Sequence, residues 1–189
     1  MPIKDESMRK IALLIFFLFS QVLLASDKPG LFPAGVVYGP KAAFKISAPD
    51  GWVLDNYSGV SQGLHCVLYP KGGSWSESKV VMYAKIASPE YPEINKFMEF
   101  TLNYFHKDDA KFTSKIAEEG KTKEGYNYTI KEYNRPSYPL HEQVAYIQLP
   151  EAVAYIVFSA PSMELRSKEL AKFKQAFNSF TYVPEYIQK

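Results

Sequence analysis

The segment Gly59-Val60-Ser61-Gln62-Gly63 has the residue types that come nearest to a catalytic motif. It matches G-x-S-x-G, the sharp turn that exposes a nucleophilic serine between a strand and a helix in α/β-hydrolases. Here the polar, turn-prone stretch 55–58 precedes the glycines, and an alternating apolar segment follows where the motif needs a helix. We therefore interpret it as a glycine-flanked loop, and we keep a small secreted or periplasmic hydrolase using Ser61 as the alternative.

The three histidines, His65, His106 and His141, do not form a metal-ligand spacing such as H-x-x-x-H. His106 lies with Asp108 and Asp109 at the end of an expected helix, where an imidazole interacts with the negative end of the helix dipole. A calcium ion would need more oxygen ligands than these two carboxylates supply. We predict no catalytic residue, no metal site and no cofactor.

Cys66 is the single cysteine, so a disulfide within the chain is impossible. In the segment 64–68, a strand would place Leu64, Cys66 and Leu68 on one face. We predict that Cys66 is a small buried hydrophobic residue and not a reactive thiol.

Aromatic residues make up 15% of the chain, with 14 Tyr, 13 Phe and 2 Trp. Tyrosine combines a large apolar face with a polar tip, which suits recognition surfaces as well as half-buried strands. Two expected loops hold aromatics beside glycines or prolines, one around residues 69–75 and one over 135–141. From these loops we take Tyr69, Trp75, Tyr138 and His141 as candidate binding residues.

The first part of the chain has the composition of an export signal. A basic head at residues 8–10 is followed by an apolar run over 11–24 and by the small pair Ala25-Ser26. The run is shorter than the roughly 20 apolar residues that span a bilayer, so we expect cleavage after Ala25 and no stable membrane span afterwards. Because acidic residues stand before Met8, we expect that residues 1–7 are an over-called start.

The net charge of +2 argues against nucleic acid as a partner. Cleavage would remove three basic and two acidic residues, leaving +1. A near-neutral chain without basic clusters has little to neutralise phosphates. We expect a periplasmic or secreted protein whose partner is another envelope or extracellular protein, or a small ligand.

Hydrophobic periodicity predicts one α+β domain over residues 44–183, after an irregular lead-in at 26–43 and before a tail at 184–189. Period-two alternation predicts strands at 44–48, from Trp52, and at 64–69, 79–87, 112–118, 126–133, 144–149 and 153–158. The last two are the most apolar, which places them centrally in the sheet. Helical periodicity covers 92–107, and Ser162 is expected to cap a closing helix.

This order is similar to that of the PsbP/Mog1/DcrB-like group. The resemblance lies in the turn Ala48-Pro49-Asp50-Gly51-Trp52 after a first strand, in one mid-chain helix between hairpins, and in a final helix that ends in Phe177-Asn178-Ser179-Phe180. It implies an antiparallel β-sheet flanked by helices, and a binding or assembly factor instead of an enzyme. We therefore expect an exported, non-catalytic binding or assembly module.

Overall fold

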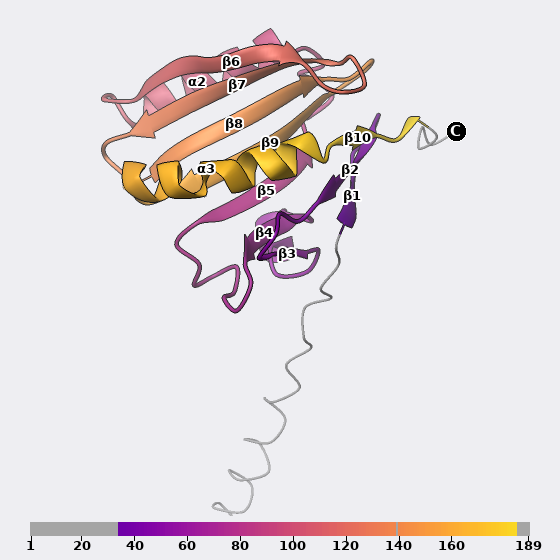
Figure 1. Ribbon diagram of the computed structural model, residues 1–189. Helices are drawn as coiled ribbons and strands as arrows, with labels where there is room; N and C mark the ends of the chain where they lie inside the picture. Colours follow the sequence, from indigo (N-terminus) through magenta and orange to yellow (C-terminus); the bar gives the residue numbers. More distant parts are fainter. Residues whose placement is uncertain (1–33, 139, 185–189) are drawn as a thin grey trace, which may run out of the picture.

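The computed structural model describes residues 34–138 and 140–184. The expected leader 1–25, the start at Met8, residues 26–33 of the lead-in and the last five residues of the tail lie outside this described part. Within it the fold is α+β, with one seven-stranded and one three-stranded antiparallel sheet and two helices on opposite faces of the larger sheet (Figure 1). The predicted class, an antiparallel sheet flanked by helices, is confirmed.

In chain order the elements are β1 (Ala34–Tyr38), β2 (Ala43–Ser47), β3 (Trp52–Asp55), the 3-10 turn η2 (Val60–Gln62), β4 (Val67–Pro70), β5 (Val81–Ile86), α2 (Ile94–Asp108), β6 (Thr113–Lys121), β7 (Asn127–Arg135), β8 (Leu140–Gln148), β9 (Val153–Ala160), α3 (Met163–Asn178) and β10 (Thr181–Tyr182).

The larger sheet has the strand order β3-β4-β5-β9-β8-β7-β6. The apolar strands β8 and β9 lie inside it, as their composition predicts, and α3 and α2 cover them from the two faces. The small sheet, of order β1-β2-β10, stands beside the β5 side of the larger one (Figure 1).

Helix α3 begins at the predicted cap. The Ser162 hydroxyl accepts a hydrogen bond from the Leu165 N–H at 3.2 Å, which satisfies one of the spare donors of the first turn. Its apolar stripe then buries Phe173 and Phe177 against the sheet, and the Phe173 ring stacks on Phe158 with centroids 5.6 Å apart. Burial of these rings fixes the position of the whole helix.

Helix α2 covers the opposite face more loosely. Ile94 is its buried residue, and the Phe97 ring meets the edge of Tyr146 with centroids 5.7 Å apart. Tyr91, Phe100 and Tyr104 form a row of neighbouring rings on the outer side of this layer. No helix in the described part, 34–138 and 140–184, is long and apolar enough to cross a bilayer.

The prediction of an irregular lead-in at 26–43 is wrong over its described portion. Residues 34–38 form β1, which pairs with β2 from Ala34 opposite Ser47 to Tyr38 opposite Ala43. The glycines that suggested a loop are needed for close packing, because a Cβ on Gly35 would lie 2.8 Å from a Leu54 methyl carbon. Glycine here marks a close approach to β3.

Three further boundaries differ from the sequence pattern. Strand β4 begins at Val67 and not at Leu64, since 60–63 forms a 3-10 turn closed by Gly63 at φ 70°. The short β10 was not predicted, and it pairs with β2. In β6 the register against β7 shifts between Ile116 and Glu118, which makes a bulge in the last strand of the sheet.

Candidate functional site

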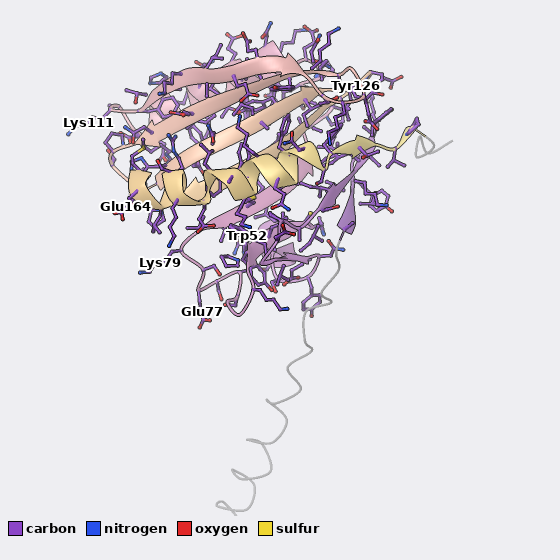
Figure 2. All side chains as sticks on the ribbon, in the orientation of Figure 1. Trp52, Glu77, Lys79, Lys111, Tyr126 and Glu164 are labelled. Atoms are coloured by element: carbon purple, nitrogen blue, oxygen red, sulfur yellow. The ribbon has the colours of Figure 1, made fainter. Side chains whose placement is uncertain are left out.

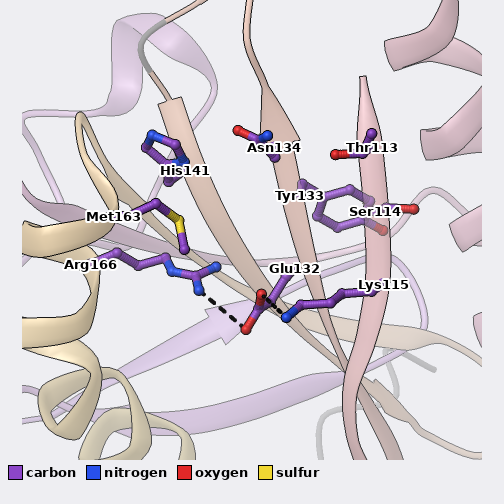
Figure 3. A pocket seen from close by; sticks show the side chains of 9 residues that line it. All are labelled: Thr113, Ser114, Lys115, Glu132, Tyr133, Asn134, His141, Met163 and Arg166. Carbon is purple, nitrogen blue, oxygen red and sulfur yellow. Dashed lines mark ion pairs between the residues drawn. The ribbon is translucent and has the colours of Figure 1, made fainter. Parts of the chain in front are cut away.

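A cavity of about 370 Å³ lies between the first turn of α3 and one end of strands β6, β7 and β8. Figure 3 shows the side chains around it. Its wall is formed by Thr113, Ser114, Lys115, Glu132, Tyr133, Asn134, His141, Met163 and Arg166. The size is in the range of small-molecule sites, so we take this cavity as the candidate functional site.

Glu132 stands at the base of the cavity between two cations. Its carboxylate lies 3.2 Å from the Arg166 Nη2 and 3.1 Å from the Lys115 Nζ (Figure 3). Lys115 is its direct cross-strand neighbour in the β6–β7 register, and Arg166 descends from α3. Three elements therefore bring one carboxylate and two basic groups together.

The two ion pairs differ in burial. The Arg166 and Glu132 side chains are 10% and 18% exposed, whereas that of Lys115 is 72% exposed. Arg166 shares its helix face with Leu170, Phe173 and Phe177, so the fold places a charge where the stripe is otherwise apolar. Such a charge needs a partner, and Glu132 supplies it.

Polar atoms around Glu132 are incompletely paired. Gln143 is 3% exposed and its Nε2 donates to Glu132 at 3.5 Å, but its Oε1 is buried and has no hydrogen-bond partner among the described residues, and the same holds for the Nδ1 of His141. Native proteins leave few buried polar atoms unsatisfied, so a concentration of them beside a cavity is typical of a functional site.

The predicted binding residue Tyr69 is not on a surface. It is 2% exposed, and its hydroxyl donates to the buried Asp55 at 2.8 Å. Tyr69 lies inside β4, one residue before the strand ends at Pro70, whereas the sequence placed it in a loop. Trp75 is half-buried on the projecting β4–β5 loop, which also carries the exposed Glu77 and Lys79 (Figure 2), and it packs against the Val53, Val67 and Tyr69 cluster.

Tyr138 is exposed, but it belongs to a structural cluster. Its ring lies 4.4 Å from the Arg135 guanidinium carbon and its hydroxyl donates to Asp108 at 3.2 Å. The buried Asp109 holds the same loop by accepting from the Ser137 N–H and hydroxyl at 3.0 and 2.8 Å. These bonds keep the pKa of Asp109 below its usual value although burial acts to raise it.

Of the four predicted binding residues, His141 is the one that lines the cavity. The sequence analysis missed Lys115, Glu132 and Arg166. Arg166 carried a usable signal, because it precedes Leu170 and Phe173 by four and seven residues and thus lies on the apolar helix face. The pairing of Lys115 with Glu132 depends on strand register, which the sequence alone did not fix.

Ser61 lies exposed on η2, between β3 and β4, and no helix of an α/β-hydrolase type follows it. Within residues 34–138 and 140–184 no hydrogen bond joins it to a histidine or a carboxylate. Cys66 is buried as predicted, and burial raises the pKa of its thiol to about 12. In the described residues no three His, Cys, Asp or Glu side chains group closely enough to hold a metal ion.

No protein-family model matches the chain, and no curated protein is similar to it in sequence. Among solved structures it is similar to the cyanobacterial PsbP protein of Synechocystis sp. PCC 6803, at 12% identity over 86% of this chain and 99% of that chain, with a TM-score of 0.49. It is also similar to a Pseudomonas aeruginosa protein of unknown function, at 12% identity over 82% and 85%, with a TM-score of 0.40. Neither likeness carries a family, a function or a site residue to this chain.

Proposed function

We propose that the protein is an exported, non-catalytic binding module and that the cavity beside the start of α3 is its binding site. The observation that supports this is the set of groups around Glu132: its ion pair with the buried Arg166, a second, exposed cation, and two buried polar atoms without a hydrogen-bond partner among the described residues. A surface built only for stability would leave these atoms paired.

The proposal favours binding over catalysis because the carboxylate in the cavity is already paired with two basic side chains. Glu132, the cavity's carboxylate, is already held by two cations, which leaves it poorly placed to take a proton from a substrate. Ser61 lies on η2, outside the set of residues that line this cavity. The arrangement can hold and orient a small polar molecule.

The binding part of the proposal is tested by blocking the cavity. Thr113 lines its mouth, so Thr113→Trp should abolish the amide chemical-shift changes that bound fragments cause at Asn134, His141 and Met163 in a fragment screen by NMR. Ile116→Trp is the matched control, because it adds the same ring to an exposed position of the same strand that points to the other sheet face. If no fragment shifts these amides in the unmodified protein, the proposed site is wrong.

The non-catalytic part is tested at Ser61. Hydrolysis of a panel of short-chain esters should stay at background in the unmodified protein and in Ser61→Ala alike. An esterase activity that Ser61→Ala abolishes would replace the proposal with the hydrolase alternative.

Export is tested by the mass of the protein recovered from its cells. The expected species begins at Ser26 and is found outside the cytoplasm. A protein that keeps residues 8–25 and stays in the cytosol would remove the exported part of the proposal and leave the cavity argument untouched.

A further inference from the structure

The cavity carries an excess of one positive charge. Lys115 and Arg166 contribute two cationic groups and Glu132 one carboxylate. A partly enclosed site binds the charge that balances its own, because an uncompensated charge in such a place is costly. The matching ligand therefore carries one negative charge.

Arg166 has donors to spare for that charge. A guanidinium has five N–H groups in a rigid fork that fits a carboxylate with two parallel hydrogen bonds. Here its ion pair with Glu132 runs through Nη2. The other guanidinium nitrogens make no hydrogen bond to a residue of the described part and are not among the atoms sealed from solvent. They remain available inside the cavity.

Lys115 can add a second contact at little cost. An ion pair made by so exposed a side chain contributes little to stability, so the ammonium group is free to turn from Glu132 to a ligand. The more buried Arg166 stays on Glu132 while its free donors hold the ligand. The carboxylate of the ligand thus lies between the two cations.

Other charge classes fit less well. A dianion such as phosphate would leave one negative charge without a partner beside Glu132. An organic cation would approach two like charges to reach a single carboxylate that is already paired. The planar fork of Arg166 also matches a carboxylate better than a point charge.

Neutral polar groups line the rest of the wall. The side chains of Thr113 and Asn134 and the Nε2 of His141 make no hydrogen bond to a residue of the described part and line the same cavity as Arg166 (Figure 3). A hydroxyl group can donate and accept, so it can bond to any of the three. A ligand with a hydroxyl close to its carboxylate would use both parts of the site.

Resting on the proposed binding function, we propose that this cavity binds a small hydroxycarboxylate monoanion, with the carboxylate on Arg166 and Lys115 and the hydroxyl on His141 or Asn134.

The experiment is an NMR titration of the protein with lactate, propionate, inorganic phosphate and ethanolamine at constant ionic strength. Lactate should shift the cavity amides saturably. Propionate has the same carboxylate without the hydroxyl and should bind about fivefold more weakly, the effect of one neutral hydrogen bond. Phosphate and ethanolamine should bind at least about tenfold more weakly than lactate.

Variants assign the binding to the cations. Arg166→Gln should weaken lactate binding by about tenfold or more, as expected for charge-assisted hydrogen bonds, and Lys115→Gln by about threefold. Lys168→Gln removes the same charge from an exposed position of α3 and should change nothing beyond its effect on net charge. Should Arg166→Gln fail to fold, the exposed Lys115→Gln decides alone.

Two results would overturn the inference. One is tighter binding of phosphate or ethanolamine than of lactate, and the other is equal loss in Lys115→Gln and Lys168→Gln. If fragments bind in the cavity while none of the carboxylates does, this inference fails and the proposed function stands. If nothing binds there, both fail.

Discussion

The two faces of the seven-stranded sheet, one covered by α3 and the other by α2, bury different kinds of side chain. Under α3 the buried layer is apolar, with Phe158, Ile156 and Met82 in one cluster with Phe173 and Phe177, and its buried charge, Arg166, lies at the cavity. Under α2 the buried layer is rich in tyrosine, and polar atoms run through it.

Hydrogen bonds between buried groups organise the α2 face. The Tyr133 and Tyr146 hydroxyls lie 2.7 Å apart in the interior. On the same face, toward β3, Tyr69 donates to Asp55. The difference shows that the sheet is stabilised by apolar burial on one face and by paired buried polar groups on the other. Among the described residues, buried side-chain atoms without a hydrogen-bond partner are few: Gln143 Oε1, His141 Nδ1 and Arg135 Nε.

The largest expected difference between the two faces is at Phe173. Phe173→Ala removes a fully buried ring from the α3 face and should lower the free energy of unfolding by about 3–5 kcal/mol. Phe100→Ala on α2 is the control. Its ring is 43% exposed, so the loss should stay under about 1 kcal/mol. Urea unfolding measures both, and equal losses would mean that α2 is as tightly docked as α3.

Asp55→Asn tests the polar side of the comparison. Asp55 accepts hydrogen bonds from the Tyr57 and Ser58 N–H groups and from the Ser58 and Tyr69 hydroxyls. Burial acts to raise the pKa of this carboxyl, but the hydrogen bonds hold it below 3.8. At pH 7 the variant should lose about 2 kcal/mol of unfolding free energy.

The sign of the pH dependence follows from that depressed pKa. The stabilisation by ionised Asp55 is complete above the unfolded pKa of 3.8 and is lost as the pH falls through the lower folded value. The gap between the unmodified protein and Asp55→Asn should therefore narrow in unfolding measured near pH 3. Asp50→Asn, at an exposed turn, is the control, and a gap that widens in acid would contradict the argument.

Tyr146→Phe tests the hydrogen bond between the two buried tyrosine hydroxyls on the α2 face. It leaves the buried Tyr133 hydroxyl without its partner and should cost about 1.5 kcal/mol in urea unfolding. The double variant Tyr133→Phe with Tyr146→Phe should cost less than the sum of the two single changes, because both unsatisfied groups are then gone. Strict additivity would show that the two hydroxyls do not interact.

Glu142→Gln should have the smallest effect, and it should be a gain. Burial raises the pKa of Glu142, and Arg135 and Ser159 oppose this only in part. A carboxyl with a raised folded pKa costs stability at pH values above its ordinary 4.5. The variant should thus be more stable by up to about 1 kcal/mol at pH 7, with no gain below pH 4. A loss at pH 7, relative to exposed Glu151→Gln, would contradict this.

Most of the fold could be predicted because its elements are local. The helical period over 92–107 corresponds to α2, the Ser162 cap starts α3, and the hairpins β6–β7 and β8–β9 join strands that are adjacent in the chain. Strands β1 and β10 were missed because each is short and gains its hydrogen bonds from β2, and because glycine and proline around β1 indicate a loop.

The candidate site was far less accessible to sequence reasoning. Lys115, Glu132 and Arg166 are ordinary surface types in the sequence, and only the β6–β7 register and the docking of α3 bring them together. Tyr69 is buried for a related reason that the sequence does not show, because its hydroxyl donates a hydrogen bond to Asp55, which comes 14 residues earlier in the chain. Local patterns find elements, whereas sites form where distant elements meet.

The bulge in β6 affects how readily this edge strand can pair with a strand of another molecule. This strand ends the larger sheet, and its outer row of peptide groups could template the addition of a foreign strand. The shifted spacing after Ile116 and the nearby charges of Glu119 and Lys121 make a poor template. The edge strand beside the cavity is therefore poorly suited to pairing with a strand of another molecule, although its peptide groups face outward.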